Sequence, residues 1–482
     1  MQKRVWEFLI KASIILLCSS SSFFAFASGL HHESDTVLDV KAFGATGDGR
    51  TDDTNAFSSA LQTLAEHGGG TLIVPSGTYV VADLRIGSNT AIKGIGVPRP
   101  TLVKRSDAAT ILNLSGELVA GSRQPLRNIT VESLILRGRS VEDGFKEHIH
   151  NLIAIGVTRL IVHDVFFAAF QGDGLYIGSR LDPSEHVLHN SDIIVSNNEF
   201  SGTNAQNRNG ISIIDCSRCI FEHNWFGDIT RSKMPGAIDI EPNRSDEVIR
   251  DIVVRNNTVQ HTNGTAAFSL ALLGRGSPAC CTHVIFEGNY VEHANVGIFV
   301  AIRSAQPKLT QLDLVIRNNM IRSVTQPLTI SDFSGWIHLA GNHFSDGPAG
   351  AAVACRSACR ISFAQNDFLR VGSESSGGIL LSGKLSSVDF RNNSFTDAGP
   401  SRKQGGAIYF ASVPINKLEV VRNKFASPNH VTHSAVGAAS DAKFTGDRVI
   451  WTGDILEDGI QAGVLSQDSG RNHHDLGSAM PL

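Results

Sequence analysis

Three stretches of the chain repeat one pattern: residues 193–200 read IIVSNNEF, residues 219–226 read CIFEHNWF and residues 252–259 read IVVRNNTV. Each has an alternating apolar segment typical of a β-strand, followed by Asn, one variable residue, and Phe or an aliphatic residue. Nine copies place this Asn at Asn198, Asn224, Asn257, Asn289, Asn319, Asn342, Asn366, Asn393 and Asn423. Successive members are 23 to 33 residues apart, which indicates a chain built from short repeated units.

Each copy is accompanied by a second short strand, usually opened by Gly, such as GLYIG at 174–178 and GISII at 210–214. A unit of two or three short strands cannot bury an apolar face alone, so the units are expected to stack edge to edge into a solenoid of parallel strands. The variable repeat length favours a single-stranded right-handed parallel β-helix, an all-β fold. A leucine-rich repeat would carry helices, and a propeller would need units of about 40 residues or more.

The recurring Asn has two expected roles. It tolerates the left-handed backbone conformation that a tight bend needs, and its side-chain amide can bond the Asn of the next coil in a ladder. The Phe or aliphatic residue two positions later is expected to point inward and stack on its equivalents.

The ends of a solenoid must be covered, because open strand edges invite aggregation. The segment from Asp52 begins an amphipathic helix with Phe57, Leu61 and Leu64 on one face, and Gly68 begins the triplet that ends it. This helix is expected to cap the first coil. We predict one β-helix over residues 28–465, divided into an N-terminal cap and first coils (36–120), Asn-ladder coils (121–430) and a C-terminal cap (431–465). Residues 466–482 read as a flexible tail.

Residues 1–27 are typical of a secretory signal peptide. Lys3 and Arg4 precede apolar runs, and Ala25-Phe26-Ala27 has the small-x-small pattern of a cleavage site. A membrane anchor is the alternative, but polar residues interrupt the apolar stretch before the roughly 20 residues that a span requires. The mature protein is therefore expected to be secreted or periplasmic, with no membrane partner after cleavage.

Six cysteines follow the predicted signal peptide, in the close pairs Cys216/Cys219, Cys280/Cys281 and Cys355/Cys359. Local disulfides suit an oxidising compartment. Zinc binding is the alternative reading of close Cys pairs, although no nearby His completes a four-ligand set. Buried free thiols are a third possibility.

Composition excludes several other classes. The 482 residues are 41% hydrophobic and only 18% charged, which is too apolar for a disordered chain. The formal net charge of −4 gives no basic surface of the kind that nucleic-acid binding requires.

Alternate residues of a strand point away from the core, and aligning the Gly-led strands puts Tyr176, Ser212 and Asp239 on one outward face, with Glu241 two residues further on. Polar residues flank these strands on both sides. The candidates for catalysis are Asp239, Glu241 and Asp173, and those for substrate binding are His150, Tyr176, Arg208, Asn209, Ser212, Asp215, Asn243 and Arg244.

Asp239 and Glu241 form the candidate reactive pair. Two residues along a strand separate their backbones by about 6.6–7 Å, a spacing that matches the acid and base of an inverting glycosidase. Asp173 could position water or substrate, and Arg208 and Arg244 could hold a substrate carboxylate. Two other interpretations stay open: the carboxylates bind calcium, or they only stabilise a turn.

The segment from Val40 to Tyr79, VKAFGATGDGRTDDTNAFSSALQTLAEHGGGTLIVPSGTY, resembles the opening of the pectate-lyase-superfamily, rhamnogalacturonase/epimerase-like β-helix proteins. The features that carry the resemblance are FGA-x-GDG, TDDT, GGG and P-x-G-x-Y. It implies a right-handed β-helix that acts on a polysaccharide. The polygalacturonase set NTD, DD, GHG and RIK is not found, nor is the DPHD stretch of alginate epimerases.

The resulting prediction is a secreted enzyme that hydrolyses an extended, uronic-acid-containing glycan. A lyase or C5-epimerase on the same face is the first alternative, and a non-catalytic carbohydrate-binding or adhesin-like β-helix is the second. The expected partner is a polysaccharide, and the chain is expected to be a monomer or homotrimer. No metal or cofactor is expected for hydrolysis, whereas a lyase would be expected to use calcium.

Overall fold

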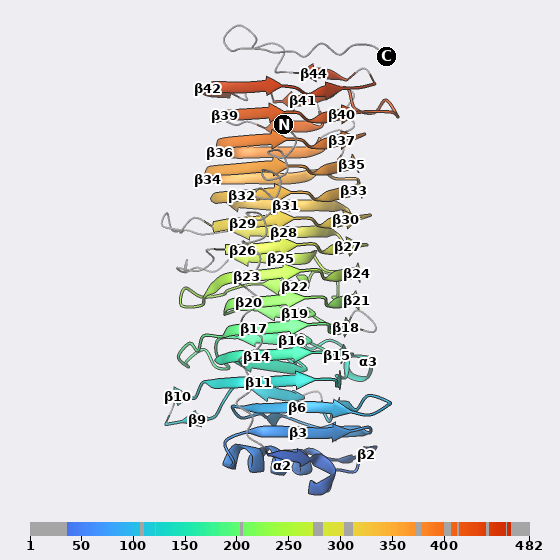
Figure 1. The fold of residues 1–482 in the computed structure, drawn as a ribbon, viewed down its shortest axis with the longest axis vertical. Helices are drawn as coiled ribbons and strands as arrows, with labels where there is room; N and C mark the ends of the chain where they lie inside the picture. The colour runs from blue at the N-terminus through green and yellow to red at the C-terminus, as the bar shows by residue number, and fades with distance from the viewer. Residues whose placement is uncertain are drawn as a thin grey trace, which may run out of the picture.

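The protein is a stack of parallel β-coils capped at its N-terminal end by a helix (Figure 1). The computed structural model describes residues 36–463 except 107–109, 121, 203–205, 273–282, 303–311, 373–376, 400–405, 412–413, 440–442 and 459. Each coil contributes strands to the same columns in turn, so residues far apart in sequence become neighbours in adjacent coils. The predicted all-β parallel β-helix is confirmed.

The strands form three columns. The first column is β5 (Leu84–Arg85), β8 (Leu112–Leu114), β13 (Leu152–Ile155), β16 (Leu175–Gly178), β19 (Ile211–Ile213), β22 (Gly236–Ile240), β25 (Ala266–Leu272), β28 (Val296–Ile302), β31 (Gln326–Phe333), β34 (Ala351–Ala364), β36 (Ile379–Arg391), β38 (Ile408–Ala411), β41 (Ser434–Ala438) and β44 (Gln461–Gly463).

The second column is β1 (Val37–Asp39), β3 (Gly70–Pro75), β6 (Thr90–Ile95), β11 (Leu126–Glu132), β14 (Val157–His163), β17 (Ser191–Ser196), β20 (Cys216–Glu222), β23 (Ile249–Arg255), β26 (His283–Glu287), β29 (Leu312–Arg317), β32 (Gly335–Ala340), the later parts of β34 and β36, β39 (Pro414–Val421) and β42 (Lys443–Thr452).

The third column is a separate sheet of fifteen strands: β2 (Asp48–Asp52), β4 (Thr78–Val81), β7 (Thr101–Lys104), β12 (Ile135–Arg137), β15 (Phe166–Ala168), β18 (Glu199–Ser201), β21 (Trp225–Ile229), β24 (Thr258–Thr262), β27 (Tyr290–Glu292), β30 (Met320–Arg322), β33 (His343–Gly347), β35 (Asp367–Val371), β37 (Ser394–Thr396), β40 (Lys424–Ala426) and β43 (Ile455–Leu456). A small antiparallel hairpin, β9 (Leu118–Val119) and β10 (Ser122–Arg123), follows β8 in the chain.

The core is made of inward residues that stack in register from coil to coil. Leu175, Ile211 and Ile238 occupy equivalent positions in β16, β19 and β22, and all three are fully buried. The Phe side chains two positions after the recurring Asn also stack as expected, with the rings of Phe200 and Phe226 4.8 Å apart between centroids. Burying these apolar columns is the main driving force for the stack.

The Asn ladder is present as predicted. Asn198 Nδ2 donates to Asn224 Oδ1 at 3.0 Å, and the same contact joins Asn224 to Asn257 at 3.0 Å. The ladder runs on to Asn423, whose Nδ2 donates to Asp454 Oδ1 at 2.9 Å.

The expected left-handed conformation, however, lies one residue earlier. Asn197 has φ 54° and Asn256 has φ 53°, while the ladder residues that follow them are not among the positive-φ residues. The bend is therefore made by the preceding residue, which leaves the ladder Asn free to point its amide inward.

Helix α2 (Thr54–Glu66) covers the first coil, with Phe57, Leu61 and Leu64 buried against it. Asp52 Oδ1 accepts a hydrogen bond from the Thr54 N–H at 3.0 Å, which satisfies one of the free donors at the start of the helix. Elsewhere in the described residues the helices are short: the 3₁₀ helix η2 (Val40–Phe43) and α3 (Ser140–Asp143).

Cys216 is disulfide-bonded to Cys219, and Cys355 to Cys359. The pair Cys280/Cys281, the predicted signal peptide 1–27 and the predicted tail 466–482 lie outside the described residues. Within the described part of the chain, no helix is long and apolar enough to cross a membrane.

Candidate active site

The first column brings the predicted outward residues together. Tyr176 pairs with Ser212, and Ser212 pairs with Asp239, in three successive strands. Asp173 and Arg208 lie in the turns that lead into β16 and β19, and Glu241 follows β22 directly. Their positions follow from the parallel register, in which equivalent strand ends stack at one edge.

Arg208 lies at the centre of this cluster. Its Nη2 is 3.0 Å from Glu241 Oε2 and 3.7 Å from Asp239 Oδ2. Its Nη1 is 3.3 Å from Asp173 Oδ2 and donates to Ser212 Oγ at 2.7 Å. One guanidinium therefore contacts three carboxyl groups. We call these residues, with His150, Tyr176 and Asn209, the Arg208 cluster.

The Asp239–Glu241 pair is closer than its backbone spacing suggested. Both carboxyl groups contact the same Nη2 atom of Arg208, so the side chains converge. In an inverting enzyme the two carboxyl groups are about 6.5–9.5 Å apart, which leaves room for a water molecule. Asp239 and Glu241 lie too close together for that arrangement.

Asp239 and Glu241 differ in their exposure. The Asp239 side chain is completely buried, and 26% of the Glu241 side chain is exposed. Asp239 Oδ2 accepts a hydrogen bond from Asn209 Nδ2 at 3.3 Å, whereas Oδ1 has no hydrogen-bond partner. Burial raises the pKa of Asp239 well above its usual value, and the charge of Glu241 raises it further against the opposing effect of Arg208.

Asp173 behaves in the opposite way although it is also fully buried. Burial opposes its ionisation, but the charge of Arg208 and the interactions with His150 and Ser212 together outweigh burial and hold the pKa of Asp173 below its usual value. The backbone N–H of Asn209 donates to Asp173 Oδ1 at 3.1 Å, which further favours the ionised form. The cluster thus contains one carboxyl group biased toward the acid and one biased toward the carboxylate.

His150 and Tyr176 form a stacked pair beside Asp173, with ring centroids 4.6 Å apart. His150 Nδ1 faces two atoms of Asp173, because it lies 3.0 Å from the backbone nitrogen and 3.2 Å from Oδ2. Burial raises the pKa of Tyr176 to about 12, and the charge of Asp173 adds to this effect. Tyr176 is therefore a neutral phenol at physiological pH.

The structure does not bring Asp215, Asn243 and Arg244 into this cluster. Asp215 Oδ2 accepts from the Val248 N–H at 2.7 Å and lies 2.8 Å from His189 Nδ1, at the turn after β19. The backbone N–H groups of Asn243 and Arg244 donate to Glu247 Oε2 at 2.6 and 2.9 Å. These residues organise turns beyond the ends of β19 and β22.

Arg208 and Arg244 both bind groups of their own chain. Arg244 Nη1 donates to the carbonyl of Pro183 at 3.3 Å, and Arg208 is held by carboxylates of its own chain. The expected pair of arginines around a substrate carboxylate is therefore not assembled.

Two residues of this region were not among the sequence candidates. Glu147 Oε1 lies 3.7 Å from Arg208 Nε, and 46% of its side chain is exposed. Lys104 is fully buried and donates from Nζ to the carbonyl of His150 at 3.0 Å. The sequence does mark Lys104 as unusual, because it occupies an inward position of the alternating strand TLVK, where a charged residue is rare.

The described residues include no group of three or more His, Cys, Asp or Glu side chains arranged to hold a metal ion. In the Arg208 cluster the guanidinium lies where a cation shared by the carboxylates would sit.

Two family models match the chain. The model described as rhamnogalacturonase A/epimerase, pectate lyase-like, matches residues 37–271, and the right-handed beta helix region matches residues 279–449. Among curated proteins, alginate lyase 7 of Azotobacter vinelandii is 43% identical over 76 residues, which are 14% of this chain and 9% of the relative. Mannuronan C5-epimerase AlgE3 of the same organism is 35% identical over 109 residues, 21% of this chain and 6% of the relative. The chain thus spans less than a tenth of either relative.

Solved structures show the same fold at low identity. The N-terminal fragment of bacteriophage Phi29 gene product 12 has a TM-score of 0.66 at 17% identity, covering 88% of this chain and 71% of that one. The A-module of the A. vinelandii epimerase AlgE6 has a TM-score of 0.52 at 14% identity, covering 87% and 99%. The catalytic unit of a GH87 alpha-1,3-glucanase from Streptomyces thermodiastaticus has a TM-score of 0.51 at 14% identity, covering 90% and 71%. These structures show the fold alone. The two family models, together with the repeats, the ladder and the helical cap, show that the chain belongs to the pectate-lyase-like superfamily of right-handed β-helix proteins.

Proposed function

We propose that this protein is a polysaccharide-active enzyme that hydrolyses glycosidic bonds at the Arg208 cluster. The observation that carries the proposal is the Asp239–Glu241 pair, in which a buried carboxyl group with a raised pKa adjoins a partly exposed one at the same guanidinium nitrogen. Burying such a pair costs stability, and perturbed carboxyl groups of this kind are concentrated at reactive sites. The relatives include enzymes that act on polysaccharides, which supports the substrate class.

Glu241 is the member of the pair that meets the substrate, because Asp239 is completely buried. The raised pKa of Asp239 favours its acid form, and the proposal requires that the pair holds one proton at the working pH. Glu241 draws on this proton and donates it to the oxygen of the scissile bond as general acid. The leaving sugar departs with that proton as a new hydroxyl group.

The general base must also reach solvent, which excludes Asp173 and Asp239. Glu147 is a further carboxylate beside Arg208, 3.7 Å from its Nε, and 46% of the Glu147 side chain is exposed. It takes a proton from the water that attacks the anomeric carbon.

A glycan panel tests this proposal with two readouts measured together. Hydrolysis gives new reducing ends without ultraviolet absorbance, and chelation of divalent cations with EDTA leaves the rate unchanged. Glu147→Gln is expected to lower kcat by about 10²–10⁴-fold. The matched control is Glu199→Gln, an exposed carboxylate of β18 outside the cluster. Equal activity of Glu147→Gln and wild type overturns the assignment of the base.

Elimination or C5-epimerisation of a uronate polymer is the second candidate. The stacked His150–Tyr176 pair favours it, because a neutral phenol and an imidazole could exchange a proton with a sugar C5. An unsaturated product with ultraviolet absorbance would identify elimination. Changed uronate NMR signals without chain cleavage would identify epimerisation. Binding without any chemical change on the whole panel would instead identify a non-catalytic β-helix.

A further inference from the structure

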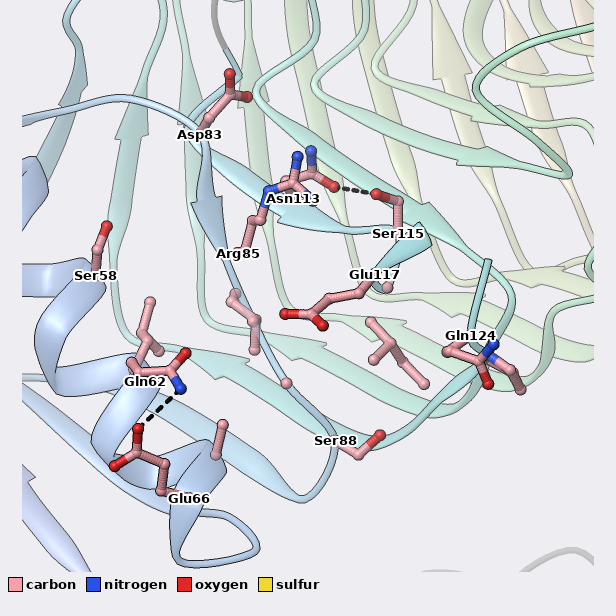
Figure 2. Close-up of a pocket in the computed structure, with 17 residues that line it drawn as sticks. Ser58, Gln62, Glu66, Asp83, Arg85, Ser88, Asn113, Ser115, Glu117 and Gln124 are labelled. Atoms are coloured by element: carbon pink, nitrogen blue, oxygen red, sulfur yellow. Dashed lines mark hydrogen bonds between the residues drawn. The ribbon is translucent and has the colours of Figure 1, made fainter. Parts of the chain in front are cut away.

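A cavity lies on the same strand column as the Arg208 cluster, nearer the N-terminal cap. It has a volume of about 730 Å³ and is enclosed by helix α2, by the turns after β5 and β8, and by the chain that follows the β9–β10 hairpin. Figure 2 shows Gln62 and Glu66 on the helix side of this cavity, with Asn113 and Glu117 facing them from the coils. We call it the cap pocket.

The strand register connects the cap pocket to the cluster. Arg85 pairs with Asn113, Asn113 with Ile153, and Ile153 with Tyr176. Tyr176 is followed in the same outward row by Ser212 and then Asp239. Asn113 is therefore four strand spacings from Asp239, about 19 Å at 4.8 Å per spacing. One extended oligosaccharide lying along the column would contact both places.

The lining of the cap pocket suits a sugar ring. Leu61, Ile86 and Leu126 give an apolar part, and polar side chains surround it. Ser115 Oγ donates to Asn113 Oδ1 at 2.6 Å, which orients the Asn113 amide and leaves its NH₂ group available as a donor (Figure 2). Apolar area with a few oriented polar groups is the usual character of small-molecule sites.

The charge of the cap pocket favours neutral sugars over uronates. The ionisable residues of the pocket are Glu66, Asp83 and Glu117, with Arg85 as the single cation. Among the described residues neither Arg85 nor Glu117 has a side-chain partner, so Glu117 presents an unpaired carboxylate. A uronate would be repelled by this excess of negative charge, whereas sugar hydroxyl groups can donate hydrogen bonds to it.

We propose that the cap pocket is a distal binding site for a neutral sugar unit of the glycan that is cleaved at the Arg208 cluster. The inference rests on the proposed function for the identity of the glycan, and it adds that this glycan carries uncharged residues about four strand spacings from the cleaved bond. The pocket supplies affinity for long chains and takes no part in the chemistry.

The test fills the pocket from the exposed face of helix α2, where substitution disturbs no core residue. Gln62→Trp places a large side chain in the pocket, and Ser59→Trp places the same side chain on the exposed helix surface outside it. Titration calorimetry uses neutral gluco-, galacto- and xylo-octaoses and octauronates as probes. We expect a neutral octaose to bind wild type and Ser59→Trp equally, and Gln62→Trp at least about tenfold more weakly.

The kinetic readout separates this site from the chemistry. With Gln62→Trp, kcat/KM for a long neutral substrate is expected to fall about tenfold while kcat/KM for a trisaccharide fragment stays unchanged. Unchanged binding and kinetics in Gln62→Trp overturn the pocket assignment, and octauronates that bind as tightly as neutral octaoses overturn the charge argument. If a neutral octaose binds in the pocket but no glycan is cleaved, the proposed function fails and the pocket stands.

Discussion

The Asn ladder and the Arg208 cluster are both buried, polar and built across adjacent coils, but they differ in charge and in hydrogen bonding. The ladder is neutral, and each Asn amide from Asn198 to Asn423 donates to the next coil and to a backbone carbonyl. The cluster is charged, and Asp239 Oδ1 is buried without a partner. A buried satisfied amide stabilises a fold, whereas a buried carboxyl oxygen without a hydrogen-bond partner destabilises it.

Within one repeat, the ladder Asn therefore serves stability, and the charged residues of the Arg208 cluster serve the proposed chemistry. Further along the row that holds Tyr176, Ser212 and Asp239, the equivalent positions are Ser269 and Phe299, which carry no charge. The coils therefore do not need charge at this position to stack. The charged coils from 150 to 241 retain groups that cost stability, and a reactive role explains their presence.

The largest expected effect comes from removing the exposed member of the carboxyl pair. Glu241→Gln is expected to lower turnover of the substrate found in the glycan panel by about 10²–10⁴-fold, because the proton donor is lost. The control is Glu222→Gln, which removes another Arg-paired Glu, 2.6 Å from Arg255 on the second column. Equal losses in the two variants would contradict a special role for the cluster.

Breaking the ladder should affect stability and not chemistry. Asn257→Leu leaves the Phe221 carbonyl and the Asn224 amide without partners, so the free energy of unfolding is expected to fall by about 2–4 kcal/mol. Chemical denaturation measures the change, and kcat of the folded fraction should stay at the wild-type value. The neighbouring Asn256→Gly is the control, because Asn256 has φ 53°, which Gly adopts freely. A loss as large in Asn256→Gly would show that the bend, and not the amide, carries the stability.

Asp239→Asn tests the charge of the cluster through pH. The pKa of Asp239 is raised by folding, so its contribution to stability is present at acid pH and is lost as pH rises from the usual 3.8 through the raised value. The neutral amide does not titrate, so the variant should gain stability relative to wild type as pH increases. Denaturation curves between about pH 4 and pH 8 measure this difference. A constant difference across that range would contradict the raised pKa.

The smallest effect is expected at the end of the ladder. Burial raises the pKa of Asp454 to about 6, and this carboxyl group accepts the last ladder bond from Asn423. The stability that it contributes is therefore lost as pH rises through about 6. Asp454→Asn should remove this pH dependence and raise the melting temperature at pH 8 by a few degrees at most. A lower melting temperature of the variant at that pH would contradict this account.

The periodic parts of the molecule could be predicted from the sequence, and the side-chain geometry could not. The spacing of the recurring Asn predicts the stack, and alternation predicts that Tyr176, Ser212 and Asp239 share a face. Alternation does not say where a long side chain ends, so the convergence of Asp239 and Glu241 on Arg208 was missed. The residues in turns, Asp215 and Arg244, were misplaced because no period governs a turn.

The protonation of Asp239 at neutral pH is the most direct test of the account. Difference infrared spectra of wild type minus Asp239→Asn report the carbonyl band of a protonated carboxyl group. The account predicts that this band persists at pH 7 and disappears only at higher pH, with Asp173→Asn showing no such band. A band that is already absent at pH 7 would mean that Asp239 is an ordinary ionised partner of Arg208, and Glu241 would lack the proposed source of its proton.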